Sequence, residues 1–226
     1  MTNDNLFSIK RSLRGKALIE YKKRLKLNLV QKDILIGTLL GDATIIKQTN
    51  KTNFNIKFEQ KIFNSDYINH LYEIFEPYVG TPPRIRNIKG GGAQDRQSIW
   101  FRTYRHIDFK FYYDLFYIED SKTLLKKKRV PQNIHKFLTA KALAYWFMDD
   151  GTKFTKNNNN YYYLSTQSFP LEDQKILVKA LKRNFNLTIN IHKDRSKYKL
   201  YILTISNVKF IELIKDFIHP CFVYKL

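Results

Sequence analysis

The sequence predicts an α+β fold made of two pseudo-symmetric αββαββα subdomains, each built around an antiparallel sheet. Two observations support this prediction. Two apolar segments each end in an acid, and these acids, Asp42 and Asp150, lie 108 positions apart. The order of helix-like and strand-like segments around the first acid is then repeated around the second. The expected parts of the chain are a basic N-terminal extension at 1–32, a first subdomain at 33–120, a linker at 121–140 and a second subdomain at 141–226.

The first half opens with a basic segment at 6–32 in which apolar residues recur at helical spacing, so a short flanking helix is expected. Asp33 precedes the apolar run 34–43 and is a candidate helix N-cap. Alternating apolar residues over 53–59 predict a strand with one buried face. The remaining expected elements are a helix over 66–78, strands over 84–88 and 98–104 on either side of the glycines at 90–92, and a helix over 108–117.

The second half begins after the basic stretch 126–129, which is predicted to be a connector. Two glutamines support an internal duplication, because Gln60 ends a strand 18 residues after Asp42 and Gln167 ends one 17 residues after Asp150. The expected elements are a helix over 141–151, a turn at 157–160, a strand over 161–167, a helix over 171–185, strands over 187–192 and 199–205, and a last helix over 208–218.

The composition excludes several classes of protein. A hydrophobic fraction of 43% over 226 residues is enough for a buried core and excludes intrinsic disorder. The chain has no run of about 18 consecutive apolar residues, so a membrane span is not expected. It carries one cysteine, Cys221, which excludes an internal disulfide, offers no zinc-binding cluster and favours a reducing compartment.

The charge of the chain points to its partner. Forty Lys and Arg residues against 20 Asp and Glu residues give a net charge of +20, which implies a polyanionic partner, most simply nucleic acid. The alternatives are a generically basic protein, such as a ribosomal one, and a membrane surface, which the even spread of basic residues disfavours. The chain is also rich in Lys, Asn, Ile, Tyr and Phe, whose codons are A+T-rich, as in many organelle genomes.

The two acid-tipped segments carry small residues at matching spacing. Gly37 and Gly41 are four positions apart and therefore share one helical face, which leaves a groove where another backbone can approach. Ala140 and Ala144 repeat this spacing in the second segment. If the two helices pack through these faces, their C-terminal ends lie side by side.

Asp42 and Asp150 would then emerge together at those ends. Two neighbouring carboxylates repel each other, and a divalent cation relieves that repulsion. Oxygen ligands favour Mg²⁺, which keeps several waters and bridges to phosphates. The simpler interpretation is that each acid merely ends a helix, but the helix dipole disfavours an acid there and it occurs twice at matching positions. With a nucleic-acid partner, paired carboxylates indicate metal-assisted phosphodiester hydrolysis.

The segments LIGTLLGDA at 35–43 and LAYWFMDDG at 143–151 resemble the two motifs of a single-chain LAGLIDADG homing endonuclease. The resemblance covers roughly 34–226 and includes the segments 166–169 and 224–226. It implies a saddle of two antiparallel sheets that straddles the major groove of double-stranded DNA, with the motif helices packed at its centre. It also implies a monomeric, Mg²⁺-dependent enzyme, with Mn²⁺ as a substitute, that cuts both strands of a long asymmetric target, leaves short 3′ overhangs and promotes intron homing. The implied location is an organelle, the mitochondrion before the chloroplast.

The same resemblance assigns site residues position by position. The penultimate acids of the motifs hold metal, the residues before them are further metal candidates, two lysines lie near the active centre and two glutamines flank the metal-bound water. The penultimate acids are Asp42 and Asp150, and the residues before them are Gly41 and Asp149. The two lysines are Lys128 and Lys225, and the two glutamines are Gln60 and Gln167. The motifs depart from the family pattern where Tyr145 replaces a glycine, Asp149 a small residue and Ala43 the final glycine, which predicts an asymmetric contact between the two helices.

Sequence readout is expected from the polar faces of the strands, because strands can lie in the major groove and Arg, Lys, Asn and Gln match base edges there. An antiparallel sheet normally has a solvated polar face, so no single residue carries much weight. The candidates are Asn55, Lys57, Glu59, Arg84, Arg86, Arg102, Tyr104, Thr188, Asn190, His192, Lys197, Lys199 and Tyr201.

Three functions remain open from the sequence. The leading hypothesis is an intron-encoded, site-specific DNA endonuclease. The second is an RNA-binding intron maturase on the same scaffold, which the sequence separates poorly from the first. The third is a DNA-binding regulator built on an inactive endonuclease, and the retention of both Asp42 and Asp150 argues against it.

Overall fold

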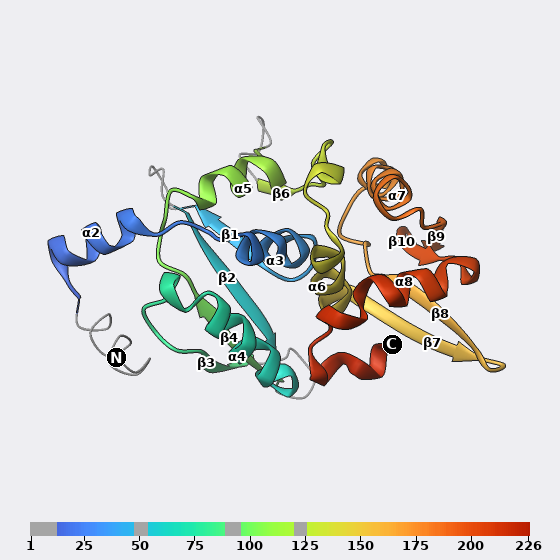
Figure 1. Cartoon of the computed structure of the whole chain (residues 1–226), viewed down its shortest axis with the longest axis horizontal. Helices are drawn as coiled ribbons and strands as arrows, with labels where there is room; N and C mark the ends of the chain where they lie inside the picture. Colours follow the sequence, from blue (N-terminus) through green and yellow to red (C-terminus); the bar gives the residue numbers. More distant parts are fainter. Residues whose placement is uncertain (1–12, 48–53, 89–95, 120–125) are drawn as a thin grey trace. The chain divides into compact units, whose positions relative to one another are not determined.

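The computed structural model describes residues 13–47, 54–88, 96–119 and 126–226, and Figure 1 traces their helices and strands. By their contacts the residues form two compact units. Unit 1 comprises 1–31 and 43–113, and unit 2 comprises 32–42 and 114–226. Helices and antiparallel sheets occur in both, which confirms the α+β class. Among the described helices, none has the length and apolarity needed to span a membrane.

Unit 1 is built on a four-stranded antiparallel sheet whose strand order is β1-β2-β4-β3. The strands are β1 (Thr44–Lys47), β2 (Phe54–Lys61), β3 (Arg84–Ile88) and β4 (Arg96–Arg102). Helix α4 (Ser65–Ile74) packs on one face of β2 and β4 and continues into a short 3₁₀ turn at Glu76–Tyr78. The core beneath it is aromatic, with the ring of Phe58 centred 5.1 Å from Phe75 and 4.9 Å from Phe101. Alternation along β2 therefore buries one face of this sheet, as expected.

Helix α2 (Gly15–Arg24) confirms the predicted N-terminal helix, while residues 6–12 of that prediction lie outside the described part. Two polar contacts tie α2 to the rest of unit 1. The Tyr21 hydroxyl donates to the carbonyl oxygen of Pro77 at 2.9 Å. The Nε2 atom of His106 lies 2.7 Å from the carbonyl oxygen of Lys22, in the last turn of the helix.

Unit 2 repeats this arrangement, because its sheet has the order β7-β8-β10-β9, which matches β1-β2-β4-β3 strand for strand. This match supports the internal duplication. The ring of Phe210 lies 5.1 Å from that of Phe147 and 5.6 Å from that of Tyr162, so helices pack on one face of the sheet. The elements are α6 (Ala140–Asp150), β7 (Gly151–Lys156), β8 (Asn159–Leu164), α7 (Leu171–Phe185), β9 (Ile189–Asp194), β10 (Lys197–Ile202) and α8 (Asn207–Ile214).

Several elements differ from the sequence prediction. The expected αββαββα pattern calls for two strands after each motif helix, but no residue range is predicted for the first of each pair, β1 and β7. The stretch predicted as a connector at 126–129 instead contains β6 (Lys126–Lys128), because its backbone pairs with β5 (Tyr117–Glu119). The predicted helices over 66–78 and 208–218 both end early in 3₁₀ turns, whereas the helix over 171–185 has the predicted bounds. The glycines at 90–92 lie outside the described residues.

The first motif helix, α3 (Leu29–Leu40), belongs to unit 2 from residue 32 onward. A Cβ atom on Gly37 would lie 2.3 Å from the carbonyl oxygen of Ala142 and 2.9 Å from the Cβ of Tyr145. The backbones of the two motif helices therefore approach each other closely at Gly37, as the glycine spacing predicts. The nearest atoms on α6 come from Ala142 and Tyr145 rather than from the expected stripe of Ala140 and Ala144.

This grouping departs from the order of the chain, because a segment placed by sequence in the first subdomain makes its contacts with the second unit. The cause is the packing of 32–42 against α6. The expected subdomain boundaries, 33–120 and 141–226, were drawn from the repeat in the sequence, whereas the two units are defined by contacts between residues. The boundaries therefore remain a prediction.

The contact at Gly37 makes a prediction about stability. Replacing glycine by alanine in a helix interior normally stabilises a protein by about 1 kcal/mol. At this position the added methyl would overlap a backbone carbonyl, so Gly37→Ala is expected to lower the free energy of unfolding by about 1–3 kcal/mol. Urea unfolding of the two proteins measures the change, and a gain in stability would show that the two helices are not in close contact.

Candidate active site

The two motif acids lie in unit 2, at the C-terminal ends of α3 and α6. Asp42 is exposed, whereas Asp150 is partly buried. Burial raises the pKa of Asp150 to about 7, and the neighbouring charge of Asp42 contributes to the rise. A carboxyl group is shifted in this way when it is desolvated close to a second carboxylate. The structure therefore brings together the two acids that the sequence singled out.

Asp149 makes a direct link between the two motifs. Its Oδ2 atom accepts a hydrogen bond from the backbone N–H of Asp42 at 3.2 Å. A Cβ atom on Gly41 would lie 2.5 Å from the Cβ of Asp149, so only glycine leaves room for this approach. The Asp149 carboxylate thereby orients the backbone that carries Asp42, a contact that the motif pattern did not reveal.

Two lysines bind carbonyl groups at the ends of the motif helices. The Nζ atom of Lys128 donates to the carbonyl oxygen of Gly41 at 2.8 Å, and that of Lys225 donates to Met148 at 2.7 Å. A cation is favourable at a helix C-terminus, where the carbonyl groups have no partner within the helix. Burial lowers the pKa of Lys128 to about 8, against the opposing charges of the nearby carboxylates, and it also lowers the pKa of Lys225.

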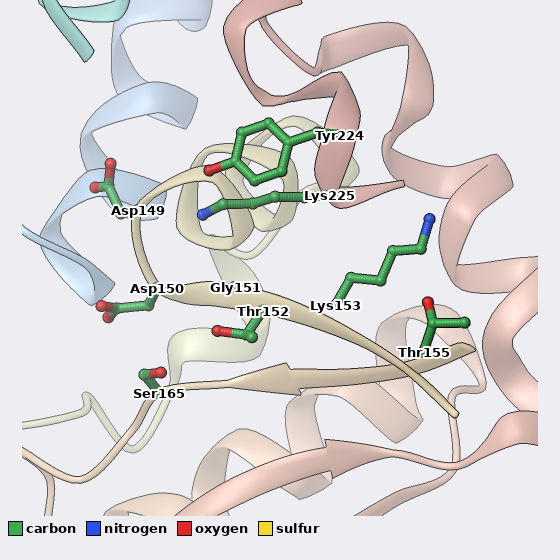
Figure 2. Close-up of a pocket in the computed structure, with 9 residues that line it drawn as sticks. All are labelled: Asp149, Asp150, Gly151, Thr152, Lys153, Thr155, Ser165, Tyr224 and Lys225. Atoms are coloured by element: carbon green, nitrogen blue, oxygen red, sulfur yellow. The ribbon is translucent and has the colours of Figure 1, made fainter. Parts of the chain in front are cut away.

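Asp149, Asp150 and Lys225 border a cavity of about 590 Å³ in unit 2. In Figure 2 the carboxylates of Asp149 and Asp150, the Thr152 hydroxyl and the Lys225 ammonium all point to the left of the view, near the start of β7. Lys153 extends away from them, and its ammonium donates to the carbonyl oxygen of Leu226. The wall of the cavity therefore combines hard oxygen donors with a cation that is held in place by a hydrogen bond.

The donor set fits a divalent metal of the hard class. Carboxylate oxygens are the ligands that Mg²⁺ prefers. The pKa of Asp150 is raised first by burial and then by the charge of Asp42, and a bound cation would offset both effects. Within the described residues, no group of three or more His, Cys, Asp or Glu side chains is arranged to hold a metal. A cation bound here would accordingly take two carboxylates from the chain and complete its coordination with water and phosphate oxygens, as Mg²⁺ commonly does.

The two glutamines lie in different surroundings. Gln60 belongs to unit 1, on β2, where its Oε1 accepts from Asn64 at 3.1 Å. Gln167 belongs to unit 2 and donates through Nε2 to Asp194 at 2.8 Å. It lines a second cavity, of about 580 Å³, that also contains Lys128. Gln167 and Lys128 thus line the same cavity. The role expected of each glutamine stays a prediction.

Sequence reasoning missed Asp173, which fixes the segment that carries Lys128. Asp173 is fully buried in the first turn of α7, and it accepts hydrogen bonds from the Arg129 guanidinium at 2.7–3.0 Å and from the Val130 N–H at 2.8 Å. Such bidentate pairs are geometrically specific. No signal in the sequence distinguishes Asp173 from its neighbour Glu172, since an acid in the first turn of a helix is common.

The predicted readout residues of unit 1 form an ionic network on the sheet. Glu59 pairs with Lys57 and lies 2.8 Å from the Arg86 guanidinium, and it accepts from the Ser98 hydroxyl at 2.6 Å. Although burial alone would raise the pKa of Glu59, the hydrogen bonds from Lys57 and Ser98 leave it lowered. Arg84 is exposed on the neighbouring strand.

Three further candidates of unit 1 differ in their surroundings. Arg102 lies with its guanidinium 5.3 Å from the ring of Trp100, on the same face. Asn55 was expected on the exposed polar face but is only 6% exposed. Tyr104 was expected in a strand, but β4 ends at Arg102, and the Tyr104 ring packs where a Cβ on Gly80 would lie 2.6 Å away. Asn55 therefore departs from the expected alternation because it is buried, and Tyr104, which is half-buried, departs from it because it lies beyond the end of β4.

The predicted readout residues of unit 2 lie on or beside β9 and β10. Thr188 precedes β9, and its backbone N–H donates to the Ser206 hydroxyl at 2.9 Å. The Lys199 ammonium lies 4.9 Å from the centre of the Tyr163 ring and 3.9 Å from the Asp194 carboxylate. Asn190 and Lys197 are exposed, while His192 and Tyr201 are half-buried in ring contacts.

The hydrogen bonds of Asp173 predict a loss of stability. Asp173→Ala leaves the buried Val130 N–H without a partner and the Arg129 side chain, which is 37% exposed, without its counter-charge, so the free energy of unfolding is expected to fall by about 2–3 kcal/mol. Glu172→Ala is the matched control, because the Glu172 side chain is 71% exposed and its pair with Lys175 lies at the surface. The control is expected to change stability by less than about 1 kcal/mol. Equal losses for the two variants in urea unfolding would refute a special role for Asp173.

Several known proteins are similar to this chain in sequence and in fold. Residues 32–210 match the LAGLIDADG DNA endonuclease family. A probable intron-encoded endonuclease of Wickerhamomyces canadensis is 33% identical over 94% of this chain and 90% of its own length. A cytochrome b mRNA maturase of Debaryomyces hansenii is 28% identical over 96% of this chain and 80% of its length. The solved structure of the homing endonuclease I-WcaI bound to its DNA recognition sequence covers 96% of this chain and 97% of its own, at 32% identity and a TM-score of 0.87. With its two motifs and its paired acids, the chain belongs to the LAGLIDADG DNA endonuclease family.

Proposed function

We propose that this protein is an intron-encoded homing endonuclease that binds a long, asymmetric double-stranded DNA site through the major groove and cuts both strands, leaving short 3′ overhangs. The observation that carries the proposal is the joint placement of Asp42 and Asp150 at the ends of the two motif helices, where Asp149 bonds the backbone of Asp42 and where burial, with the charge of Asp42, raises the pKa of Asp150. The net charge of +20 on the chain supports a polyanionic substrate. Cutting an intronless copy of the target would promote homing of the intron.

The proposed metal is Mg²⁺, with Mn²⁺ as a substitute, held by Asp42 and Asp150. When bound, the metal supplies Lewis-acid stabilisation of the charge that develops on the phosphate. The carboxylates are the groups that position it. Asp149 contributes by orienting the backbone of Asp42 through the 3.2 Å hydrogen bond.

The two lysines have different proposed tasks. Lys128, whose pKa lies at about 8, is partly neutral near that pH and can accept a proton from the attacking water. Lys225 lines the same cavity as Asp150, and its ammonium can stabilise the charge on the phosphate oxygens. The hydrogen bonds to Gly41 and Met148 hold the Nζ atoms of both lysines in place before the substrate arrives.

The gene is proposed to lie in an organelle intron, in the mitochondrion before the chloroplast. The A+T-rich codon usage implied by the composition supports this location, and so does the similarity to a probable intron-encoded endonuclease of a yeast. The similarity to a cytochrome b mRNA maturase supports a second candidate function, the binding of intron RNA to assist splicing. The two functions are separated by testing whether the protein cuts DNA.

The endonuclease function is tested by replacing each motif acid with the amide of the same shape. Asp42→Asn and Asp150→Asn each remove a ligand charge while the shape of the side chain is kept. Each variant is expected to cut at least about a hundredfold more slowly in Mg²⁺, and to bind the same duplex in Ca²⁺ within about threefold of the wild type. The substrate is a duplex that the wild-type protein selects by cleavage from a pool of randomised sequences.

Asp66→Asn is the matched control, because Asp66 is an exposed acid on α4 in unit 1, apart from the motif acids. It is expected to cut at the wild-type rate. Near-normal cutting by either motif variant would remove that acid from the active site. A wild-type protein that binds intron RNA but cuts no duplex in the pool would favour the maturase function.

The raised pKa of Asp150 predicts a pH dependence of metal binding. Below about pH 7 this carboxyl is largely protonated, and a proton must leave before the oxygen can bind a cation. The apparent affinity for Ca²⁺ is therefore expected to rise about tenfold between pH 6 and pH 8 and then to level off. Calorimetric titration of the DNA-free protein measures it. Asp150→Asn should bind weakly at both pH values, and a flat profile for the wild type would contradict a carboxyl that titrates near neutrality.

A further inference from the structure

A continuous row of rings crosses the sheet of unit 2. The row consists of Phe154 on β7, Tyr161 and Tyr163 on β8, Tyr201 on β10 and His192 on β9. We call these five residues the ring row. The ring centres are 6.3 Å apart for Phe154 and Tyr161, 6.2 Å for Tyr161 and Tyr201, 5.0 Å for Tyr163 and Tyr201, and 4.8 Å for Tyr201 and His192. Contacts at these distances hold each ring against the next.

The ring row lies on the face of the sheet opposite to the packed helices. Phe154 pairs with Tyr161, and Tyr201 pairs with Tyr163, so the register places these side chains on one face. The adjacent residue, Tyr162, points to the other face, where it contacts Phe147 of α6 and Phe210 of α8. The ring row is partly exposed, and Phe154 reaches 53%. A partly exposed aromatic surface of this kind is a candidate binding surface.

The Lys199 ammonium group is held against the ring row. The Lys199 ammonium lies over the Tyr163 ring, at 4.9 Å from its centre, and it also pairs with Asp194. A lysine held in this way offers its charge to the ring and to the carboxylate. The rings therefore form the middle of a face that also carries the exposed Asn190 and Lys197, in a chain of net charge +20.

The equivalent strands of unit 1 present a different chemistry. In β2 and β4, which correspond to β8 and β10 by strand order, the same kind of face carries Lys57, Glu59 and Arg102 around Trp100. Charged and amide groups can read guanine and adenine by hydrogen bonds, whereas rings cannot form the bidentate pairs that such readout needs. The two sheets therefore differ in what they can recognise.

We propose that the sheet of unit 2 reads its half of the DNA target through the C5-methyl groups of thymines, which pack on the ring row. This inference rests on the proposed endonuclease function and names the base chemistry that one of its two sheets recognises. The thymine methyl is the one apolar group that a base presents in the major groove. The half of the target that unit 2 contacts is accordingly rich in A·T pairs, whereas the half that unit 1 contacts is read through hydrogen bonds.

The test uses uracil, which has the hydrogen-bonding edge of thymine but lacks the methyl group. Wild-type protein first selects cleavable duplexes from a randomised pool, which defines the target. The half contacted by unit 2 is identified as the half whose base preferences change with Tyr163→Ala, while Arg102→Ala in unit 1 marks the other half. Deoxyuridine then replaces thymine in one half at a time, and binding is measured in Ca²⁺ without cutting.

In the half contacted by unit 2, each contacted thymine is expected to lose about fourfold in affinity when its methyl is removed. The same replacement in the other half is expected to have little effect. Tyr163→Phe keeps the ring and should keep the full sensitivity to uracil. Tyr163→Ala should bind thymine and uracil duplexes almost equally, because the surface that packs on the methyl is gone.

Equal binding of thymine and uracil duplexes by the wild type, with cleavage intact, would overturn the inference and leave the endonuclease function standing. If no duplex in the pool is cut, the proposed endonuclease function fails, and this inference fails with it.

Discussion

The active site depends on the close approach of two backbones at glycine. Gly37 lies against the carbonyl of Ala142, and Gly41 leaves the space that the Asp149 side chain occupies. A side chain at either position would push α3 away from α6. The charge coupling of Asp42 with Asp150 and the hydrogen bond from Asp42 to Asp149 both require this contact. A packing constraint thus sets the electrostatics of the site, because carboxylates repel and would separate if the helices allowed it.

The duplication in this chain is exact in topology but not in chemistry. Both sheets share one strand order, and each motif helix receives a lysine at its C-terminal end. Lys128 binds the carbonyl one residue before Asp42, whereas Lys225 binds the carbonyl two residues before Asp150. The two halves of the active site are therefore not equivalent, and each strand of a bound duplex would meet a different arrangement of groups.

Sequence reasoning succeeded where the signal was periodic or duplicated. The helix over 171–185, the strand over 84–88 and the paired acids follow from hydrophobic spacing and from the repeat. It failed where tertiary contacts decide the structure. The stretch Lys126–Lys128 has the composition of a loop but becomes a strand because β5 offers a partner edge. Asp173 resembles any acid near the start of a helix, and its importance arises from Arg129, which lies 44 positions away. Contacts between distant positions leave no local pattern to read.

The division of the chain between its units has a consequence for biosynthesis. The first motif segment, 32–42, makes its contacts with unit 2, yet it leaves the ribosome about 108 residues before the second motif is made. At typical rates of synthesis, this interval is on the order of 5–20 seconds. Throughout it, an apolar helix with Ile34, Leu35 and Leu39 that are fully buried in the finished protein has no partner to cover it. The nascent chain thus presents a binding site for chaperones that the folded enzyme no longer displays.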